Sequence, residues 1–299
     1  MSATPYDDRD GQIWFDGEMV PWRDAKVHLL THALHYASSV FEGVRMYNGN
    51  IFKLTEHSER LHNSAKILGF EIPWTTDQIN QACMDACEIN GIKDGYIRPV
   101  AWRGSEMMGV SAQKNTIHLA VAAWEWPSYF SPEARMRGIR LQTSKWKRPS
   151  AETEPVHSKA AGLYMICTLS KHAAEQAGFD DSLMLDYRGQ VAEATGANIF
   201  MEMGDGKLHT PIPDCFLDGI TRRTIIELAK KRGIDVVERV IMPDELANAT
   251  QVFLTGTAAE VTPVGAIDSH TYTVGEITKQ MMNDYDKAVG KSPANASAA

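Results

Sequence analysis

The chain has 299 residues, 43% of them hydrophobic and 23% charged, which is enough to bury the core of one large or two medium globular domains. A net charge of −8 argues against nucleic acid or an anionic membrane as a partner, because both require a basic face. No apolar run reaches the ~20 residues that span a bilayer, and the first ten residues lack a signal-peptide pattern. None of the four cysteines forms a CxxC pair, and Cys83 and Cys87 are expected to share a buried helix face, so we expect a reduced, cytoplasmic protein.

Two β-hairpins are predicted in the first part of the chain. Strand-like residues 13–15 and 18–20 flank Asp16-Gly17, and residues 44–47 and 51–54 flank Asn48-Gly49-Asn50. Asp-Gly and Asn-Gly favour tight hairpin turns because these residues tolerate positive φ angles.

Two helices and two strands are predicted next. Thr55 can cap a helix that ends at about residue 68, and Thr75 with Gln78 fits a capping box for a helix that stops at Asn90-Gly91. Residues 96–102 and 116–126 then alternate or run apolar like strands.

A linker is predicted at residues 127–138, which contain two prolines and several polar residues. It would separate an N-terminal domain, residues 1–126, from a C-terminal domain, residues 139–299, that carries Lys159. The second domain is expected to contain the following elements: a strand at 139–143, a helix at 162–177, a hairpin at 183–193, a helix at 221–232 and a strand at 251–254.

Three features of the second part could together hold an aldehyde cofactor that bears a phosphate. Lys159 lies among small residues that leave room for a planar ring, although residue type alone favours a surface lysine at a helix start. Residues 218–221 precede a helix and residues 255–257 follow a strand, so their N–H groups could bind a phosphate; the alternatives are an Asp218 N-cap and a plain turn. Glu193 could pair with a pyridine nitrogen or simply face solvent.

Eight motifs in chain order resemble branched-chain amino-acid aminotransferases, which are class IV (fold type IV) enzymes dependent on pyridoxal 5'-phosphate (PLP). The motifs are HALHY at 32–36, VFEGVR at 40–45, YIRP at 96–99, MGV at 108–110, KAAGLY at 159–164, EATGAN at 193–198, GITR at 219–222 and GTAAE at 256–260. The resemblance runs from about residue 13 to residue 285. It implies an α/β (α+β) fold of two domains with PLP at their interface.

The resemblance also implies roles for individual residues at the cofactor. Lys159 would bind the PLP aldehyde covalently and later move the substrate Cα proton. Glu193 would pair with the pyridine nitrogen and Tyr164 with the phenolic oxygen of the ring. The phosphate would be bound by Arg60, Ile220, Thr221 and Thr257.

The substrate residues follow from the same resemblance. The aromatic wall of an apolar pocket would consist of Tyr36, Phe41, Trp126, Tyr129 and Tyr164. Carboxylates would be bound by Tyr96, Arg98, Thr257 and Ala258. Met108, Gly109 and Val110 would reach the pocket from a neighbouring subunit, which implies a homodimer or a larger homo-oligomer.

Two departures from the commonest bacterial pattern could tune the substrate range. Arg103-Gly104-Ser105-Glu106 adds polar residues to a loop near the pocket, and Ala194-Thr195 with Ala197 follow Glu193. His28, His32 and His35 have a spacing that could suggest a metal, but they lack a definite carboxylate partner, so we treat them as structural and expect no metal.

These features together predict PLP-dependent transamination between L-leucine, L-isoleucine or L-valine and 2-oxoglutarate, which yields branched-chain 2-oxo acids and L-glutamate. The alternatives within the same fold are a D-amino-acid or (R)-amine transaminase and an aminodeoxychorismate lyase. A third hypothesis is a non-catalytic binding protein that has kept the fold, although every position that is catalytic in the family carries the expected residue type here.

Overall fold

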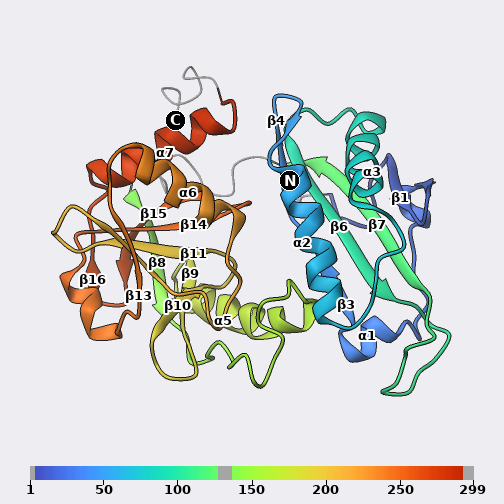
Figure 1. Cartoon of the computed structure of the whole chain (residues 1–299), viewed down its shortest axis with the longest axis horizontal. Coiled ribbons are helices and arrows are strands. Elements are labelled where there is room, and N and C mark those ends of the chain that lie inside the picture. The colour runs from blue at the N-terminus through green and yellow to red at the C-terminus, as the bar shows by residue number, and fades with distance from the viewer. Residues whose placement is uncertain (1–3, 127–136, 292–299) are drawn as a thin grey trace. The chain divides into compact units, whose positions relative to one another are not determined.

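The computed structural model describes residues 4–126 and 137–291, which divide into two compact units (Figure 1). The first unit contains residues 4–126 and 158–162, and the second contains residues 137–157 and 163–291. Lys159 packs with the first unit because residues 158–160 hydrogen-bond to that unit. The sequence had predicted Lys159 in the second domain. The predicted linker at 127–138 lies outside the described residues except for its last two positions.

An antiparallel sheet of seven described strands forms the centre of the first unit. The strands are β1 (Gln12–Phe15), β2 (Glu18–Pro21), β3 (Ser39–Phe41), β4 (Val44–Tyr47), β5 (Asn50–Ile51), β6 (Gly95–Arg103) and β7 (Ile117–Glu125). Their order is β2-β1-β7-β6-β4-β5, and β3 pairs with β6. Both predicted hairpins are confirmed, and their turns use positive φ at Asp16, Gly17, Asn48 and Gly49. The second hairpin has a shorter return strand than predicted because a helix already begins at Leu54.

Two long helices belong to the first unit. Its helical segments are η1 (Trp22–Asp24, a 3-10 turn), α1 (His32–Tyr36), α2 (Leu54–Ile67) and α3 (Thr76–Ile89). The capping box of α3 is confirmed: Gln78 N–H donates to Thr75 Oγ1, and Thr75 N–H donates to Gln78 Oε1. The predicted Thr55 cap of α2 is wrong, because Lys53 occupies the N-cap in a left-handed conformation and Thr55 Oγ1 accepts a hydrogen bond from Asn80 instead.

Apolar side chains of α2 and α3 pack on the sheet to form the core of the first unit. Leu61 and Ala65 of α2 and Ile79 of α3 are fully buried among strand residues such as Val44 and Ile97. Cys83 and Cys87 lie on this buried face of α3, as the spacing predicted. Burial raises the pKa of the Cys87 thiol to about 12, so the side chain stays protonated and contributes as an apolar group.

A sheet of nine described strands forms the second unit. The strands are β8 (Ile139–Thr143), β9 (Asp181–Leu185), β10 (Val191–Ala194), β11 (Asn198–Glu202), β12 (Leu208–Pro211), β13 (Val236–Arg239), β14 (Gln251–Gly256), β15 (Glu260–Ile267) and β16 (His270–Thr271). Since β10 pairs with both β9 and β11, the six strands β10-β9-β8-β15-β14-β11 close into a ring. β8 runs parallel to β9 and β15, and β12 runs parallel to β13.

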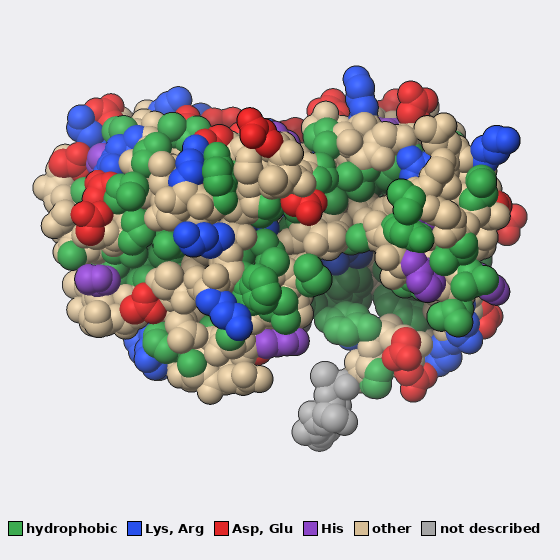
Figure 2. All heavy atoms as spheres, turned by 90° about the horizontal axis from the view of Figure 1, so that it is seen from below, with side chains coloured by type: hydrophobic (Ala, Val, Ile, Leu, Met, Phe, Trp, Pro, Cys, Tyr) green, Lys and Arg blue, Asp and Glu red, His purple; other side chains and the backbone are tan. Residues whose placement is uncertain are grey.

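The helical segments of the second part are η2 (Ala161–Tyr164), α5 (Met165–Gln176), α6 (Ile220–Lys231), η3 (Pro243–Asn248) and α7 (Glu276–Ala288). The helices predicted at 162–177 and 221–232 are confirmed, except that the first one begins as the 3-10 turn η2. Every described helix is shorter or more polar than a membrane crossing requires. On the face shown in Figure 2, acidic and basic side chains lie interspersed on the surface of each unit.

Candidate functional site

The backbone around Lys159 is fixed within the first unit. Lys159 N–H donates to Ser64 Oγ at 3.0 Å, and its carbonyl accepts the Phe41 N–H at 3.2 Å. Ser158 Oγ donates to the carbonyl of Ser64 at 3.0 Å, and Ala160 forms a β-bridge with Val40. The ammonium nitrogen lies 5.0 Å from the centroid of the Phe41 ring. Lys159 is therefore anchored between β3 and α2 rather than exposed at a helix start.

Arg60 belongs to a buried charge network on the same helix. Its Nε and NH2 groups donate to the two oxygens of Glu42 at 2.6 and 2.9 Å, and His57 Nδ1 lies 2.6 Å from one of those oxygens. Glu42 is fully buried. Burial alone would raise the pKa of Glu42, but Arg60 and His57 outweigh it and hold that pKa well below its ordinary value. Burial lowers the pKa of His57, so its imidazole is neutral and donates from Nδ1.

Four of the predicted substrate residues form one cluster in the first unit. The guanidinium carbon of Arg98 lies 4.7 Å from the centroid of the Phe41 ring and 5.2 Å from that of Tyr96, and its NH2 group donates to Tyr96 Oη at 3.1 Å. The Trp126 ring lies 5.5 Å from the Tyr96 ring. This arrangement joins a cation to an aromatic surface, which suits a carboxylate and an alkyl group respectively. Tyr129 lies outside the described residues.

A second cluster of predicted substrate residues surrounds the loop at 107–110 and consists of Tyr36, Met108, Gly109 and Val110. Tyr36 Oη donates to the carbonyl of Met108 at 3.3 Å, and the His32 ring stacks on Tyr36. His32 bonds through Nδ1 to Ser38 Oγ at 2.6 Å and through Nε2 to the carbonyl of Gly109 at 3.0 Å. These contacts give His32 a structural role, as predicted, because they hold the loop.

In the second unit, Glu193 is buried on β10 with two polar neighbours. Asn198 Nδ2 donates to Glu193 Oε2 at 3.1 Å, and Arg148 Nε lies 3.4 Å from Oε1. Arg148 also interacts electrostatically with Tyr164, so this cation lies near two predicted cofactor residues, Glu193 and Tyr164. Buried polar partners of this kind contradict the alternative of a solvent-facing glutamate.

Asn198 also connects Glu193 to the start of α6. Its Nδ2 donates to the carbonyl of Leu217 at 3.0 Å, and its Oδ1 accepts the N–H of Gly219 at 3.2 Å. Gly219 is the N-cap of α6, and a Cβ there would lie 2.2 Å from Asn198 Oδ1, so a larger residue would displace the Asn198 side chain. The alternative of an Asp218 cap is wrong, because the Asp218 carboxylate accepts from Arg222 NH1 at 2.9 Å.

Ile220 and Thr221 form the buried first turn of α6. The first N–H groups of a helix have no partner within the helix, and they carry the positive end of its dipole. Thr257 and Ala258 lie in the tight turn between β14 and β15, where Gly256 pairs with Glu260. Each of these two segments offers backbone donors of the kind that bind phosphate or carboxylate oxygens.

Five residues of these networks were given no role by the sequence analysis: Glu42, His57, Ser64, Arg148 and Asn198. Glu42 and Asn198 occur inside the motifs VFEGVR and EATGAN, but these motifs did not indicate what role the two residues have. The helical spacing of His57, Arg60 and Ser64 could have shown that they share a face of α2. Arg148 lies in a loop without periodicity, and nothing in the local sequence singles it out.

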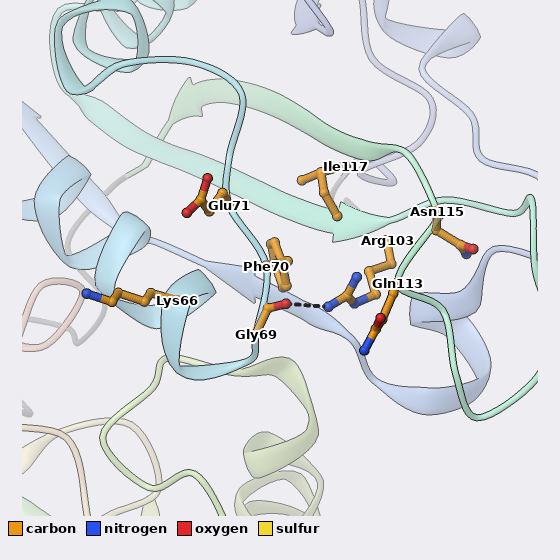
Figure 3. Close-up of a pocket in the computed structure, with 8 residues that line it drawn as sticks. All are labelled: Lys66, Gly69, Phe70, Glu71, Arg103, Gln113, Asn115 and Ile117. Atoms are coloured by element: carbon orange, nitrogen blue, oxygen red, sulfur yellow. Dashed lines mark hydrogen bonds between the residues drawn. The ribbon is translucent and has the colours of Figure 1, made fainter.

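A separate pocket of about 480 Å³ lies in the first unit (Figure 3). Arg103 lines it and donates to the carbonyls of Gly69 at 2.8 Å and Ala112 at 3.1 Å. The other lining residues are Lys66, Gly69, Phe70, Glu71, Gln113, Asn115 and Ile117. Among the described residues, no residue predicted to bind cofactor or substrate lines this pocket.

Among the described residues, one group of side chains has metal-like spacing. Asp186, Asp214 and Cys215 each place a ligand atom within 4.8 Å of the others. Arg188 donates to Asp186 at 2.7 Å and to both oxygens of Asp214 at 2.9 Å, so a guanidinium already balances the two carboxylates. Burial raises the pKa of Cys215 to about 12, which disfavours the thiolate that a metal requires. The group is therefore a structural ion-pair cluster.

Comparison with known proteins identifies the family. Residues 39–267 match the family model for amino-transferase class IV. The chain is 42% identical over 297 residues to the branched-chain-amino-acid aminotransferase of Pseudomonas aeruginosa, and the alignment covers 97% of this chain and 96% of that protein.

Solved structures agree with this match. The crystal structure of the Escherichia coli branched-chain amino acid aminotransferase has a TM-score of 0.91 at 38% identity and covers 95% of this chain and 96% of that chain. The T.th. branched-chain amino acid aminotransferase with pyridoxamine 5'-phosphate has a TM-score of 0.91 at 40% identity and covers 97% of each chain. The predicted fold class, α/β of fold type IV, is thereby confirmed, and the chain belongs to the class IV aminotransferases.

Proposed function

We propose that the protein catalyses PLP-dependent transamination between L-leucine, L-isoleucine or L-valine and 2-oxoglutarate. The products are the corresponding 2-oxo acids and L-glutamate. The observation that carries the proposal is the 42% identity, over 97% of the chain, to a branched-chain-amino-acid aminotransferase. A neighbouring structure that contains pyridoxamine 5'-phosphate, the amino form of the cofactor, supports the same chemistry.

The donor set of the described residues fits PLP. We assign Lys159 to the aldehyde, Glu193 to the pyridine nitrogen and Tyr164 to the phenolic oxygen. The phosphate falls to Arg60, Ile220, Thr221 and Thr257. The polar partners of Glu193 favour its ionised form, which suits a protonated pyridine nitrogen. When bound, PLP supplies an electrophilic carbon and an electron-withdrawing ring.

The same proposal assigns the movement of substrate and proton to residues of this chain. Phe41, Tyr96 and Trp126 contact the alkyl side chain, and Arg98 binds the distal carboxylate of the 2-oxo acid through charge-assisted bonds. Thr257 and Ala258 bind the α-carboxylate. The Lys159 amine would remove the Cα proton as a general base and, as a general acid, would deliver a proton to the carbon derived from the cofactor aldehyde rather than back to Cα. Tyr36, Met108, Gly109, Val110, Tyr129 and Tyr164 complete the proposed pocket.

A lysine substitution and a donor panel test this function. Lys159→Ala should remove the absorbance of the cofactor bound covalently to the protein and the glutamate that forms from 2-oxoglutarate, because the amine assigned to the cofactor aldehyde is gone. Borohydride treatment of the parent should fix the cofactor mass to the peptide that contains residue 159. Full turnover in the variant, or a faster reaction of D-leucine than of L-leucine in the parent, would contradict the assignment.

We further infer a cytoplasmic homodimer or larger homo-oligomer. The four cysteines are free and buried, which fits a reducing compartment. Leu29, Leu34 and Val110 are 74%, 61% and 85% exposed, and His32 and Tyr36 connect the helix that carries Leu34 to the loop that carries Val110. Exposed apolar side chains grouped in this way are typical of a subunit interface. Sedimentation at the mass of a single chain would contradict the inference.

A further inference from the structure

The proposed function gives Arg60 a task but leaves its buried partner unexplained. Glu42 lies between Phe41 and Gly43, is fully buried and accepts hydrogen bonds from Arg60, His57 and the Gly43 N–H. Burial of a carboxylate costs several kcal/mol, and a well-paired buried ion pair is often no more stable than apolar side chains of similar volume. Packing alone therefore gives no reason for a charge at position 42.

The geometry of the pair indicates what the charge does. A bidentate contact through Nε and NH2 fixes the plane of the guanidinium, whereas an unrestrained arginine side chain populates many rotamers. The neutral His57 donates Nδ1–H to Oε2 at 2.6 Å and thereby fixes the carboxylate in turn. The orientation of Arg60 is thus determined by two residues that lie behind it in the core.

The same helix also holds the lysine backbone. His57, Arg60 and Ser64 follow one another at spacings of three and four residues, so they lie along one side of α2. Ser64 accepts the Lys159 N–H and the Ser158 hydroxyl. Besides burial, the positive charge of Lys159 helps to lower the pKa of His57. One rigid element therefore sets the positions of the amine segment and of the arginine.

We propose that Glu42, supported by His57, is a positioning residue that holds the Arg60 guanidinium in the orientation that receives the cofactor phosphate. This inference rests on the assignment of Arg60 to the phosphate in the function proposed above. Glu42 also places a negative charge near a phosphate dianion. Orientation and charge therefore predict opposite effects when the charge is removed: loss of orientation weakens phosphate binding, whereas loss of charge repulsion strengthens it.

A comparison of two ligands isolates the phosphate contribution. PLP and pyridoxal, which lacks the phosphate, are titrated into the cofactor-free full chain, and the ratio of their affinities measures what the phosphate contributes. Glu42→Gln keeps the shape of the side chain but loses the charge-assisted bonds. We expect it to weaken PLP binding by about tenfold or more and to leave pyridoxal binding within about threefold of the parent. Glu59→Gln, an exposed position on the same helix, is the matched control and should change neither affinity.

A pair of histidine variants tests the second link. His57→Asn can place an amide nitrogen near the position of Nδ1, whereas His57→Leu removes the donor and keeps an apolar volume. Under the proposal, the asparagine variant retains most of the preference for PLP over pyridoxal and the leucine variant loses it. Equal preferences in these two variants would show that the His57 donor does not act on Arg60.

Three results would overturn the positioning role of Glu42. Equal losses of PLP and pyridoxal affinity in Glu42→Gln would indicate a structural role, and tighter PLP binding would indicate that Glu42 acts only through its charge. If Arg60→Met leaves the preference for PLP over pyridoxal unchanged, Arg60 does not bind the phosphate, and Glu42 then has no positioning role. None of these results depends on turnover, so a failure of the transaminase assignment is detected separately by the donor panel.

Discussion

At the scale of single residues, Asn198 connects three segments of the second unit through its side chain. Its side chain donates to Glu193 and to the Leu217 carbonyl and accepts the Gly219 N–H. Asn198→Ala would remove one hydrogen-bond partner from each of these three groups, and a buried polar group that loses a partner costs about 1–3 kcal/mol. We expect a loss of that size in the free energy of unfolding of the cofactor-free chain, measured by urea denaturation. Asn283→Ala, at an exposed position on α7, is the control, and an equal effect of both changes would contradict the connecting role.

The sequence singled out the residues that we propose to carry chemistry, but not the residues that support them. Lys159 and Glu193 occur in recognisable motifs, and each makes hydrogen bonds in the structure, where Lys159 is half-buried and Glu193 is buried. Arg148 and Glu42 could not be assigned, because a supporting ion pair depends on which distant segment comes alongside. Eighteen residues separate Glu42 from Arg60, and 45 separate Arg148 from Glu193. Short motifs do not encode such separations.

At the scale of elements, the capping box of α3 is a local feature whose energy can be measured. Thr75→Ala removes the acceptor for the Gln78 N–H and should lower the free energy of unfolding by about 1 kcal/mol. Thr76→Ala, one position into the helix, is the matched control and should be neutral or slightly stabilising, since alanine has the higher helix propensity. Urea denaturation of both variants decides the matter, and equal free energies of unfolding would show that the cap contributes nothing.

The bounds of many elements were predicted within one or two residues, including strands such as β6 and β8, but the pairing between distant strands was not predicted. The Asp16-Gly17 turn and the Thr75 cap depend on neighbours within four residues. The ring of six strands depends on β10 pairing with both β9 and β11, and on β8 lying parallel to β9 and β15. Register between such strands is fixed by packing of the whole sheet rather than by periodicity. The wrong Thr55 cap shows the limit locally, because Lys53 took the N-cap in a conformation that is uncommon for its residue type.

At the scale of the whole molecule, the buried network of Glu42 and His57 should lower the free energy of unfolding as the pH falls. Both groups have lowered pKa values in the folded chain, so on acidification the unfolded chain takes up protons before the folded one. For His57 this begins below the ordinary value of 6.5, and for Glu42 it begins below 4.5. Each proton lowers the free energy of unfolding by about 1.4 kcal/mol per pH unit until the folded group also titrates.

The contribution of His57 can be separated from that of other titrating groups by a difference measurement. Urea denaturation of the cofactor-free parent and of His57→Asn is compared at several pH values from 7.5 to 5. The parent should lose stability more steeply than the variant below pH 6.5, because the asparagine cannot take up a proton in the unfolded chain. Parallel curves would mean that His57 keeps an ordinary pKa in the fold. In that case His57 would not be held as a neutral donor to Glu42, and the buried network would lack its second support.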